Sequence, residues 1–174
     1  MFLLLMTPGV DPLVEHWRAE HDWAARFGIP AHVTVRTPFL EPDEWPDVWS
    51  DRLTALLPVT LTLGCLEDRP GALVILVQPD DQLQALTQAV GAIWPGLPPH
   101  KPNFERPAYH VTVVRTQDAE TRRRASDEIA PHLPLEVTGT ALWAAHGSPE
   151  TGHVHRVVAT APLDAHAASA RLSQ

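Results

Sequence analysis

The feature that most constrains the fold is a four-residue motif that occurs once in each half of the chain. The two copies, His32-Val33-Thr34-Val35 and His110-Val111-Thr112-Val113, are identical letter for letter. Each copy lies in a short apolar run of the kind that forms a β-strand. A repeated motif of four letters arises by chance in about one chain in ten of this length, so its position along the chain decides its weight.

Hydrophobic periodicity shows where the motif stands among the predicted elements. It predicts the element order β-α-β-α-β, and this order occurs twice along the chain. The first pass has predicted strands at 2–6, 31–36 and 59–66 and predicted helices at 11–27 and 43–57. The second pass has predicted strands at 72–77, 109–114 and 135–144, predicted helices at 80–94 and 118–130, and an extra strand at 153–161. The motif occupies the second strand both times, which favours an internally duplicated fold.

We therefore expect an α+β fold in a single bilobal domain over residues 1–174, with lobe-forming repeats at about 1–66 and 72–161. A chain of 174 residues is long enough to bury a core in one domain. Each lobe is expected to hold its own sheet with helices on the outer face. The Pro-rich segment 95–107 shows neither period and directly precedes the second motif, which is typical of a functional loop.

The motif has a chemical meaning because side chains alternate between the two faces of a strand. In each copy His and Thr point to one face while the two Val residues point to the other. If the lobes are related by a two-fold axis, a phosphate between the motifs meets two hydroxyl donors and two groups that titrate near neutral pH.

Hydrolysis of a phosphodiester needs that set of groups. One neutral imidazole removes a proton from water and one imidazolium protonates the departing oxygen, each transfer contributing about 10²- to 10⁴-fold in rate. The hydroxyls stabilise charge on the phosphoryl oxygens. The sequence thus predicts His32 and His110 as catalytic residues and Thr34 and Thr112 as phosphate ligands, without any cofactor or metal.

Two arginines follow the motifs. Arg36 lies two residues beyond Thr34, hence on the same face if the strand stays regular. There it is a candidate phosphate ligand, and a solvated strand end stays open as the alternative. Arg115 lies five residues beyond His110, hence on the opposite face of a regular strand, and is therefore a weaker candidate for phosphate binding than Arg36.

On these residues the chain resembles the 2H phosphoesterase superfamily, including the LigT-like family of 2'-5' RNA ligases and RNA 2',3'-cyclic phosphodiesterases. The resemblance implies two mainly antiparallel sheets with helices outside and a central cleft. It also implies that His32 donates a proton to the leaving oxygen and that His110 accepts one from water. After the first motif the chain reads Arg36-Thr37-Pro38-Phe39, where many LigT-like members have an apolar Phe-Leu-Gly. An RNA end, a mononucleotide and an ADP-ribose cyclic phosphate therefore all stay open as substrates.

Composition limits the binding partners and the cellular compartment that we expect for this chain. The net charge of −8 argues against an extended nucleic-acid surface, because such binding needs many cations. The single Cys65 lies in an apolar run, which predicts a buried thiol and a reducing compartment. No segment is long and apolar enough to cross a membrane, and the first apolar run lacks a basic leader. We expect a cytoplasmic monomer that binds a cyclic nucleotide or an RNA 2',3'-cyclic phosphate end.

Two other functions stay open beside hydrolysis of a cyclic phosphate to a monoester. A protein that binds nucleotides or phosphate without turnover would use the same four residues. A metal-dependent hydrolase would use other histidines, and His153 and His155 do alternate on a predicted strand. No carboxylate or thiolate pattern accompanies them, so an ordinary strand face is the favoured interpretation of that pair.

Overall fold

The structure is a computed structural model that describes residues 2–40, 50–78, 81–97, 109–148 and 152–161, with the backbone alone at 50, 148 and 153–156. The described strands are β1 (Phe2–Met6), β2 (His32–Arg36), β3 (Val59–Arg69), β4 (Ala72–Val77), β5 (His110–Arg115), β6 (Leu135–Gly139), β7 (Ala141–Ser148) and β8 (Gly152–Thr160). The described α-helices are α1 (Asp11–His21), α2 (Trp23–Arg26), α3 (Ser50–Thr54), α4 (Asp81–Ile93) and α5 (Ala119–Ile129).

Most predicted elements are confirmed to within a few residues, and the differences have local causes. The helix predicted at 11–27 is interrupted at Asp22, whose extended backbone (φ −113°, ψ 113°) separates α1 from α2. The strand predicted at 135–144 is two strands, β6 and β7. Of the helix predicted at 43–57, the part from 50 to 54 is α3, and 41–49 lie outside the described residues, as do 98–108 of the Pro-rich loop.

The strands form one eight-stranded sheet in the order β6-β3-β4-β5-β2-β1-β7-β8, so the prediction of two separate sheets is wrong. The halves β8-β7-β1-β2 and β5-β4-β3-β6 are joined because β2 and β5 pair antiparallel, with Val33 opposite Val111. Strands are also exchanged between the two passes, since β3 pairs with β4 and β7 pairs with β1. Periodicity shows which residues form strands but not which strand becomes the partner, and that choice decides the number of sheets.

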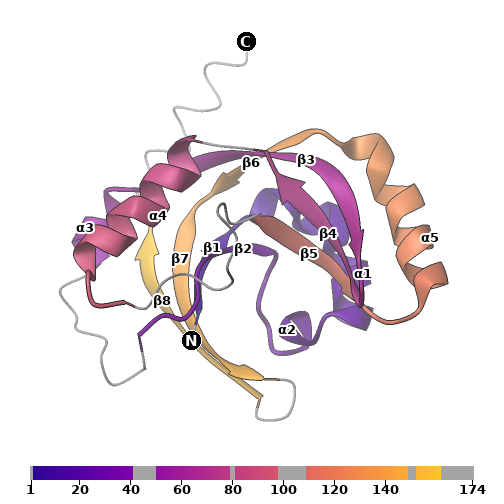
Figure 1. Ribbon diagram of the computed structural model, residues 1–174, viewed down its shortest axis with the longest axis horizontal. Coiled ribbons are helices and arrows are strands. Elements are labelled where there is room, and N and C mark those ends of the chain that lie inside the picture. The colour runs from indigo at the N-terminus through magenta and orange to yellow at the C-terminus, as the bar shows by residue number, and fades with distance from the viewer. Residues whose placement is uncertain (1, 41–49, 79–80, 98–108, 149–151, 162–174) are drawn as a thin grey trace.

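The sheet curls back on itself, as Figure 1 shows. A single residue, Thr140, separates β6 from β7, yet these strands stand first and seventh in the sheet. The Thr140 N–H donates to the Met6 carbonyl over 3.2 Å. Gly139 lies against Leu5, and a Cβ at this position would lie 2.6 Å from Leu5 Cγ. A glycine therefore permits the close approach of β6 to β1.

The two faces of the sheet carry different apolar clusters. One face carries the main core, in which the motif valines Val33, Val35, Val111 and Val113 are fully buried. Helices α1, α4 and α5 cover this core with Val14, Trp17, Leu83, Leu86, Val90, Ala125 and Ile129. The opposite face carries a smaller cluster of Leu4, Met6, Ala24, Ile29 and Ala145.

Four of the described strands contain a β-bulge, which changes the face to which the following residue points. The register shifts leave an extra residue at Val35 in β2, at Gly64 in β3, at Val113 in β5 and at Val158 in β8. In β3 the shift follows buried Leu63, and Cys65 is exposed, so the prediction of a buried thiol is wrong. A regular strand would have placed Cys65 on the buried face of Leu63.

None of the described helices is long and apolar enough to cross a membrane.

Candidate active site

The two copies of the motif lie side by side at the centre of the sheet, on β2 and β5. In both copies the valines are buried in the main core, so His and Thr lie on the opposite face, which we call the HxT face. Because Val33 is opposite Val111 in an antiparallel pair, His32 stands across from Thr112 and Thr34 across from His110. Such cross-strand neighbours have Cβ atoms about 4.5–5.5 Å apart. The four residues therefore share one sheet surface and do not face one another between two sheets.

The HxT face has an approximate two-fold symmetry. His32 pairs with Met6 on β1, and His110 pairs with Leu76 on β4, which occupies the equivalent place in the other half. His32, Thr34 and His110 are half-buried, while Thr112 is 8% exposed. Each half thus presents an imidazole and a hydroxyl to the same region.

The bulge in β2 separates Arg36 from this face. Thr34 pairs with Leu4, whereas Arg36 pairs with Leu3, and these two neighbours on β1 point to opposite faces. Leu3 belongs to the main core and Leu4 to the smaller cluster. The regular alternation on which the phosphate role of Arg36 was predicted is therefore interrupted.

Arg36 lies instead near Tyr109. Burial raises the pKa of the Tyr109 phenol, while its hydrogen bond with Thr87 and the positive charge of Arg36 act in the opposite direction. The Tyr109 hydroxyl lies 2.8 Å from Thr87 Oγ1, on α4. The charge of Arg36 thus acts on a side chain that packs against the main core.

The equivalent bulge in β5 brings Arg115 onto the HxT face. Thr112 pairs with Val74 and Arg115 with Ala72, two residues that share a face of β4. Arg115 Nη2 donates to Thr112 Oγ1 over 3.3 Å. Regular alternation predicts that Arg36, and not Arg115, shares a face with the motif residues. The bulges in β2 and β5 give the opposite result.

His32 has a fixed orientation and a strongly shifted pKa. Its Nδ1 lies 2.8 Å from the Pro30 carbonyl, and since a carbonyl only accepts, Nδ1 carries the proton and Nε2 is left as the acceptor. Burial lowers the pKa of His32 to about 4, against the Pro30 hydrogen bond, which raises it. The ring is therefore neutral at pH 7.

His110 has a cation beside it where His32 has a carbonyl. Arg69 Nη1 lies 3.4 Å from His110 Nδ1, and Arg69 Nη2 also donates to Glu67 Oε2 over 2.9 Å. A guanidinium only donates, so a hydrogen bond in this contact has Nδ1 of His110 as the acceptor. The two rings thus share a motif position and differ in their partners.

Behind Arg115 lies a buried ionic network. Arg115 Nε donates to Asp22 Oδ1 over 3.2 Å, and Arg18 binds the other oxygen, Oδ2, with Nη2 at 2.9 Å and Nε at 3.2 Å. Arg18 Nη2 also donates to the Ile29 carbonyl over 3.1 Å. Arg18 is 3% exposed and Asp22 is 1% exposed. The sequence pattern predicts no role for Arg18 and Asp22, because residues from α1, from the break after it and from a distant strand meet here only in the fold.

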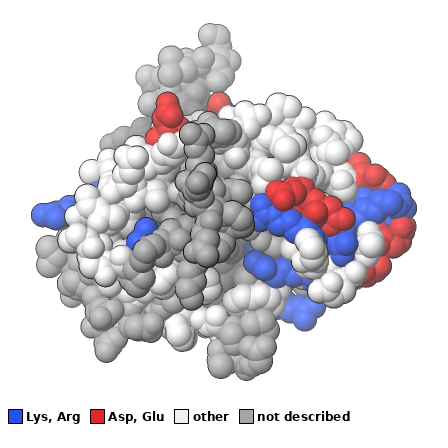
Figure 2. Space-filling view, in the orientation of Figure 1, with Lys and Arg blue, Asp and Glu red and all other residues white. Residues whose placement is uncertain are grey.

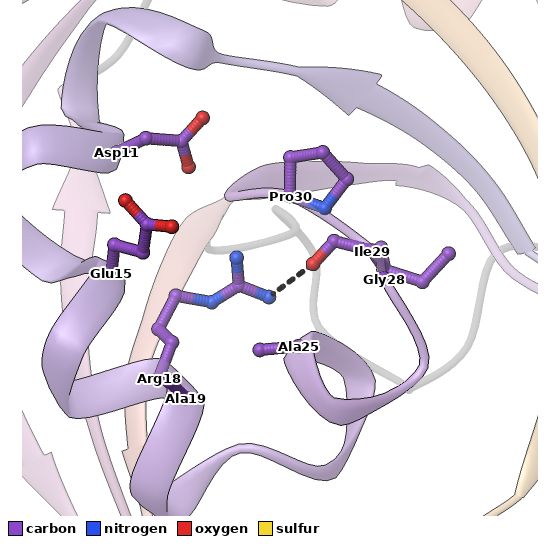
Figure 3. A pocket seen from close by; sticks show the side chains of 8 residues that line it. All are labelled: Asp11, Glu15, Arg18, Ala19, Ala25, Gly28, Ile29 and Pro30. Atoms are coloured by element: carbon purple, nitrogen blue, oxygen red, sulfur yellow. Dashed lines mark hydrogen bonds between the residues drawn. The ribbon is translucent and has the colours of Figure 1, made fainter.

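A pocket opens beside this network, between α1 and the segment that follows α2 (Figure 3). Asp11, Glu15 and Arg18 project from α1 toward Ile29 and Pro30. Asp11 accepts from the Ala31 N–H over 2.9 Å, and burial raises the pKa of its carboxyl. The four motif residues do not line this pocket, although the Pro30 carbonyl and Arg18 connect it with His32 and Asp22.

Charges of both signs are interleaved on the face shown in Figure 2, over the flank that holds α5 in Figure 1. Arg122 pairs with Asp68, and Arg123 pairs with both Glu120 and Asp127. These pairs neutralise much of the basic run at 122–124.

Among the described side chains, no three His, Cys, Asp or Glu residues lie together as metal ligands. The side chains of His153 and His155, the candidate ligand pair, lie outside the described part, and their backbone belongs to β8.

Comparison with known proteins finds a family profile that matches the sequence and a solved structure of similar fold. The sequence profile of the 2'-5' RNA ligase superfamily matches residues 7–150. The crystal structure of E. coli LigT complexed with 3'-AMP is similar, with a TM-score of 0.50 and 18% sequence identity over 90% of this chain and 92% of that chain. A crystal structure described as a phosphoesterase is 20% identical, with a TM-score of 0.49, over 91% of this chain and 97% of that one. No curated protein sequence matches.

Proposed function

The chain belongs to the 2'-5' RNA ligase superfamily, the LigT-like 2H phosphoesterases, and from this premise we propose that it is a metal-independent cyclic phosphodiesterase. Its substrate is a nucleoside 2',3'-cyclic phosphate or a related cyclic nucleotide, which it opens to a phosphomonoester. The observation that carries the proposal is the placement of His32, Thr34, His110 and Thr112 on one face of two paired strands. An anion above that face meets two hydroxyls and two imidazoles at once.

In the proposed reaction a water oxygen attacks phosphorus while one imidazole takes the water proton. The bond from phosphorus to one ribose oxygen breaks, and the other ring, as an imidazolium, protonates that oxygen. Thr34 and Thr112 donate to the non-bridging oxygens, which gain charge in the transition state. Arg115 adds a cation on the same side, because its Nη2 already reaches Thr112. We assign the phosphate cation to Arg115 and not to Arg36, since the bulge in β2 pairs Arg36 with a core residue.

We assign the proton acceptor to His110 and the donor to His32, as the family resemblance implies. A neutral ring is what an acceptor needs, and the Arg69 contact supports it at His110. His32 is neutral in the ligand-free protein, where its pKa is about 4, so the donor role requires that bound phosphate raise this pKa. A negative charge close to Nε2 has that effect because it stabilises the imidazolium.

The test is incubation of the protein with nucleoside 2',3'-cyclic phosphates in EDTA, followed by separation of cyclic phosphate and monoester. Turnover that persists in EDTA and disappears in His32→Ala and His110→Ala supports the proposal. Turnover that EDTA abolishes supports a metal-dependent hydrolase.

The second candidate is a nucleotide-binding protein without turnover. The crystallisation of E. coli LigT with 3'-AMP, a nucleoside monophosphate, makes a nucleotide the natural ligand to test for this fold. Saturable binding of 3'-AMP together with no product from any cyclic phosphate would favour this candidate.

A further inference from the structure

Asp22 links the break between two helices to the HxT face. Asp22 is the C-cap of α1 and the N-cap of α2, and its Oδ1 accepts a hydrogen bond from the Ala24 N–H over 3.2 Å. The extended backbone at Asp22 ends the helix that the sequence predicts to continue to residue 27. The break leaves the carboxylate buried between Arg18 and Arg115, to both of which it is hydrogen-bonded.

The two partners of Asp22 differ in exposure. The Arg115 side chain is 45% exposed, whereas that of Asp22 is 1% exposed and that of Arg18 is 3% exposed. A long exposed arginine has many rotamers, and ordering it costs about 1.5–2 kcal/mol of conformational entropy. A buried carboxylate held by two bonds from Arg18 and one from a backbone amide is a fixed anchor for such a side chain.

The contacts of Arg115 divide its guanidinium between two tasks. Nε donates to Asp22 Oδ1, and Nη2 donates to Thr112 Oγ1. The hydroxyl oxygen of Thr112 is thereby used as an acceptor, which leaves its proton available to donate to a phosphate oxygen. Arg18, Asp22 and Arg115 together carry one net positive charge beside Thr112, because the single carboxylate balances only one of the two guanidiniums.

We propose that Asp22, held by Arg18, is a positioning residue that aims Arg115 and the Thr112 hydroxyl at the phosphate. This inference rests on the proposed function for its substrate and deepens it by naming the residue that orders the phosphate site. Asp22 touches neither substrate nor reacting atoms, and it acts only through Arg115.

The test is a double-mutant cycle of Asp22→Asn and Arg115→Met, measured both as kcat/KM on a 2',3'-cyclic phosphate and as Kd for 3'-AMP. Asp22→Asn alone should lower kcat/KM by about 10- to 100-fold, because small displacements of positioned groups have effects of this size. In the Arg115→Met background the same change should have less than about a two-fold effect, since the residue through which it acts is gone. Equal effects of Asp22→Asn in both backgrounds would overturn the proposal.

The matched control is Asp127→Asn, the same chemical change at an exposed carboxylate that pairs with Arg123 on α5. It should change neither kcat/KM nor Kd. Melting temperatures of all variants, with rates expressed per folded protein, separate positioning from stability.

Because Asp22 is buried and charged, Asp22→Asn can lose the fold, and Arg115→Lys then tests the anchor from its exposed end. Lysine keeps the charge but has one nitrogen, which cannot bind Asp22 and Thr112 as the guanidinium does. Positioning predicts that Arg115→Lys loses nearly as much activity as Arg115→Met. Activity of Arg115→Lys near that of the wild type shows that charge alone suffices, and overturns the proposal.

The two proposals fail in different ways. A wild-type protein that binds 3'-AMP but opens no cyclic phosphate contradicts the proposed function, and the cycle in Kd still decides the role of Asp22. A wild-type protein that turns over substrate with additive effects of the two substitutions contradicts only the role of Asp22.

Discussion

The β2 half and the β5 half of the HxT face begin from the same four residues and the same bulge, yet they hold different groups. In the β5 half the bulge delivers Arg115 to Thr112, while in the β2 half it turns Arg36 toward the main core. His32 has the Pro30 carbonyl at Nδ1, and His110 has the Arg69 guanidinium there. An identical motif thus fixes the position of the side chains, and the surrounding residues give each half its neighbouring charges and hydrogen-bond partners.

The largest expected effect of this difference is on stability in acid, and it belongs to the His32 half. Above pH 6.5 His32 is neutral in both the folded and the unfolded chain. As pH falls from about 6.5 to about 4, the unfolded chain binds a proton at this site and the folded chain does not, so the free energy of unfolding decreases. Below about pH 4 both forms are protonated and the effect is complete, at no more than about 3 kcal/mol.

Denaturant unfolding of the wild type and of His32→Asn at a series of pH values measures this decrease in the free energy of unfolding. The variant should lose most of the decrease between pH 6.5 and pH 4. The same pH dependence in wild type and variant would show that folding does not hold His32 neutral between pH 6.5 and pH 4.

The next effect compares the two arginines. Arg115→Met should lower kcat/KM on a cyclic phosphate by about 10- to 100-fold, since a charged hydrogen bond to an anion is worth about 1.5–3 kcal/mol. Arg36→Met should lower it by less than about three-fold per folded protein, because Arg36 pairs with a core residue and lies near Tyr109. Steady-state kinetics of the two variants, together with their melting temperatures, shows which arginine binds the phosphate. A larger loss in Arg36→Met would reverse the assignment of the phosphate cation.

A third measurement concerns the proton state of His32 with ligand. Titration of the histidine ring signals by NMR should give His32 a pKa of about 4 without ligand and a value about one unit higher or more with saturating phosphate. The direction follows from the attraction between the anion and the imidazolium. Should the pKa of His32 stay unchanged while phosphate binds, His32 is not the proton donor, and the roles of the two histidines are reversed.

The smallest expected effect compares the two hydroxyls. Both Thr34→Val and Thr112→Val remove a donor to phosphate, but Thr112→Val also removes the partner of Arg115 Nη2. We therefore expect Thr112→Val to lower kcat/KM about three-fold further than Thr34→Val, equivalent to under 1 kcal/mol. In the Arg115→Met background this difference should vanish, and a difference that persists there would contradict the coupling of Thr112 to Arg115.

The sequence predicts which residues of the candidate site share a face, because that placement depends on short-range alternation. His32 and Thr34 share a face with Val33 opposite, and the second motif behaves in the same way, as period-two geometry requires. The strands were also placed to within a few residues, since their apolar runs are bounded by turn residues.

What the sequence did not reveal has three physical origins. First, bulges follow Thr34, Leu63 and Thr112, and an extra residue in a strand leaves no local signature in the sequence. Regular alternation therefore predicts the wrong face of the strand for Arg36, Cys65 and Arg115. The choice of strand partners joined two expected sheets into one, through a pairing between residues far apart in sequence. The role of Asp22 depends on contacts with Arg18 and Arg115, the second of which lies 93 residues away.

The two-histidine mechanism is tested most directly by the initial rate of opening of adenosine 2',3'-cyclic phosphate in EDTA. The proteins to compare are the wild type, His32→Ala, His110→Ala and the double variant. The wild type should open the ring, and each single variant should be slower by about 10²- to 10⁴-fold. The double variant should be little worse than either single one, because the two rings act as a unit. Wild-type rates in both single variants would contradict the claim that two imidazoles on paired strands perform the reaction.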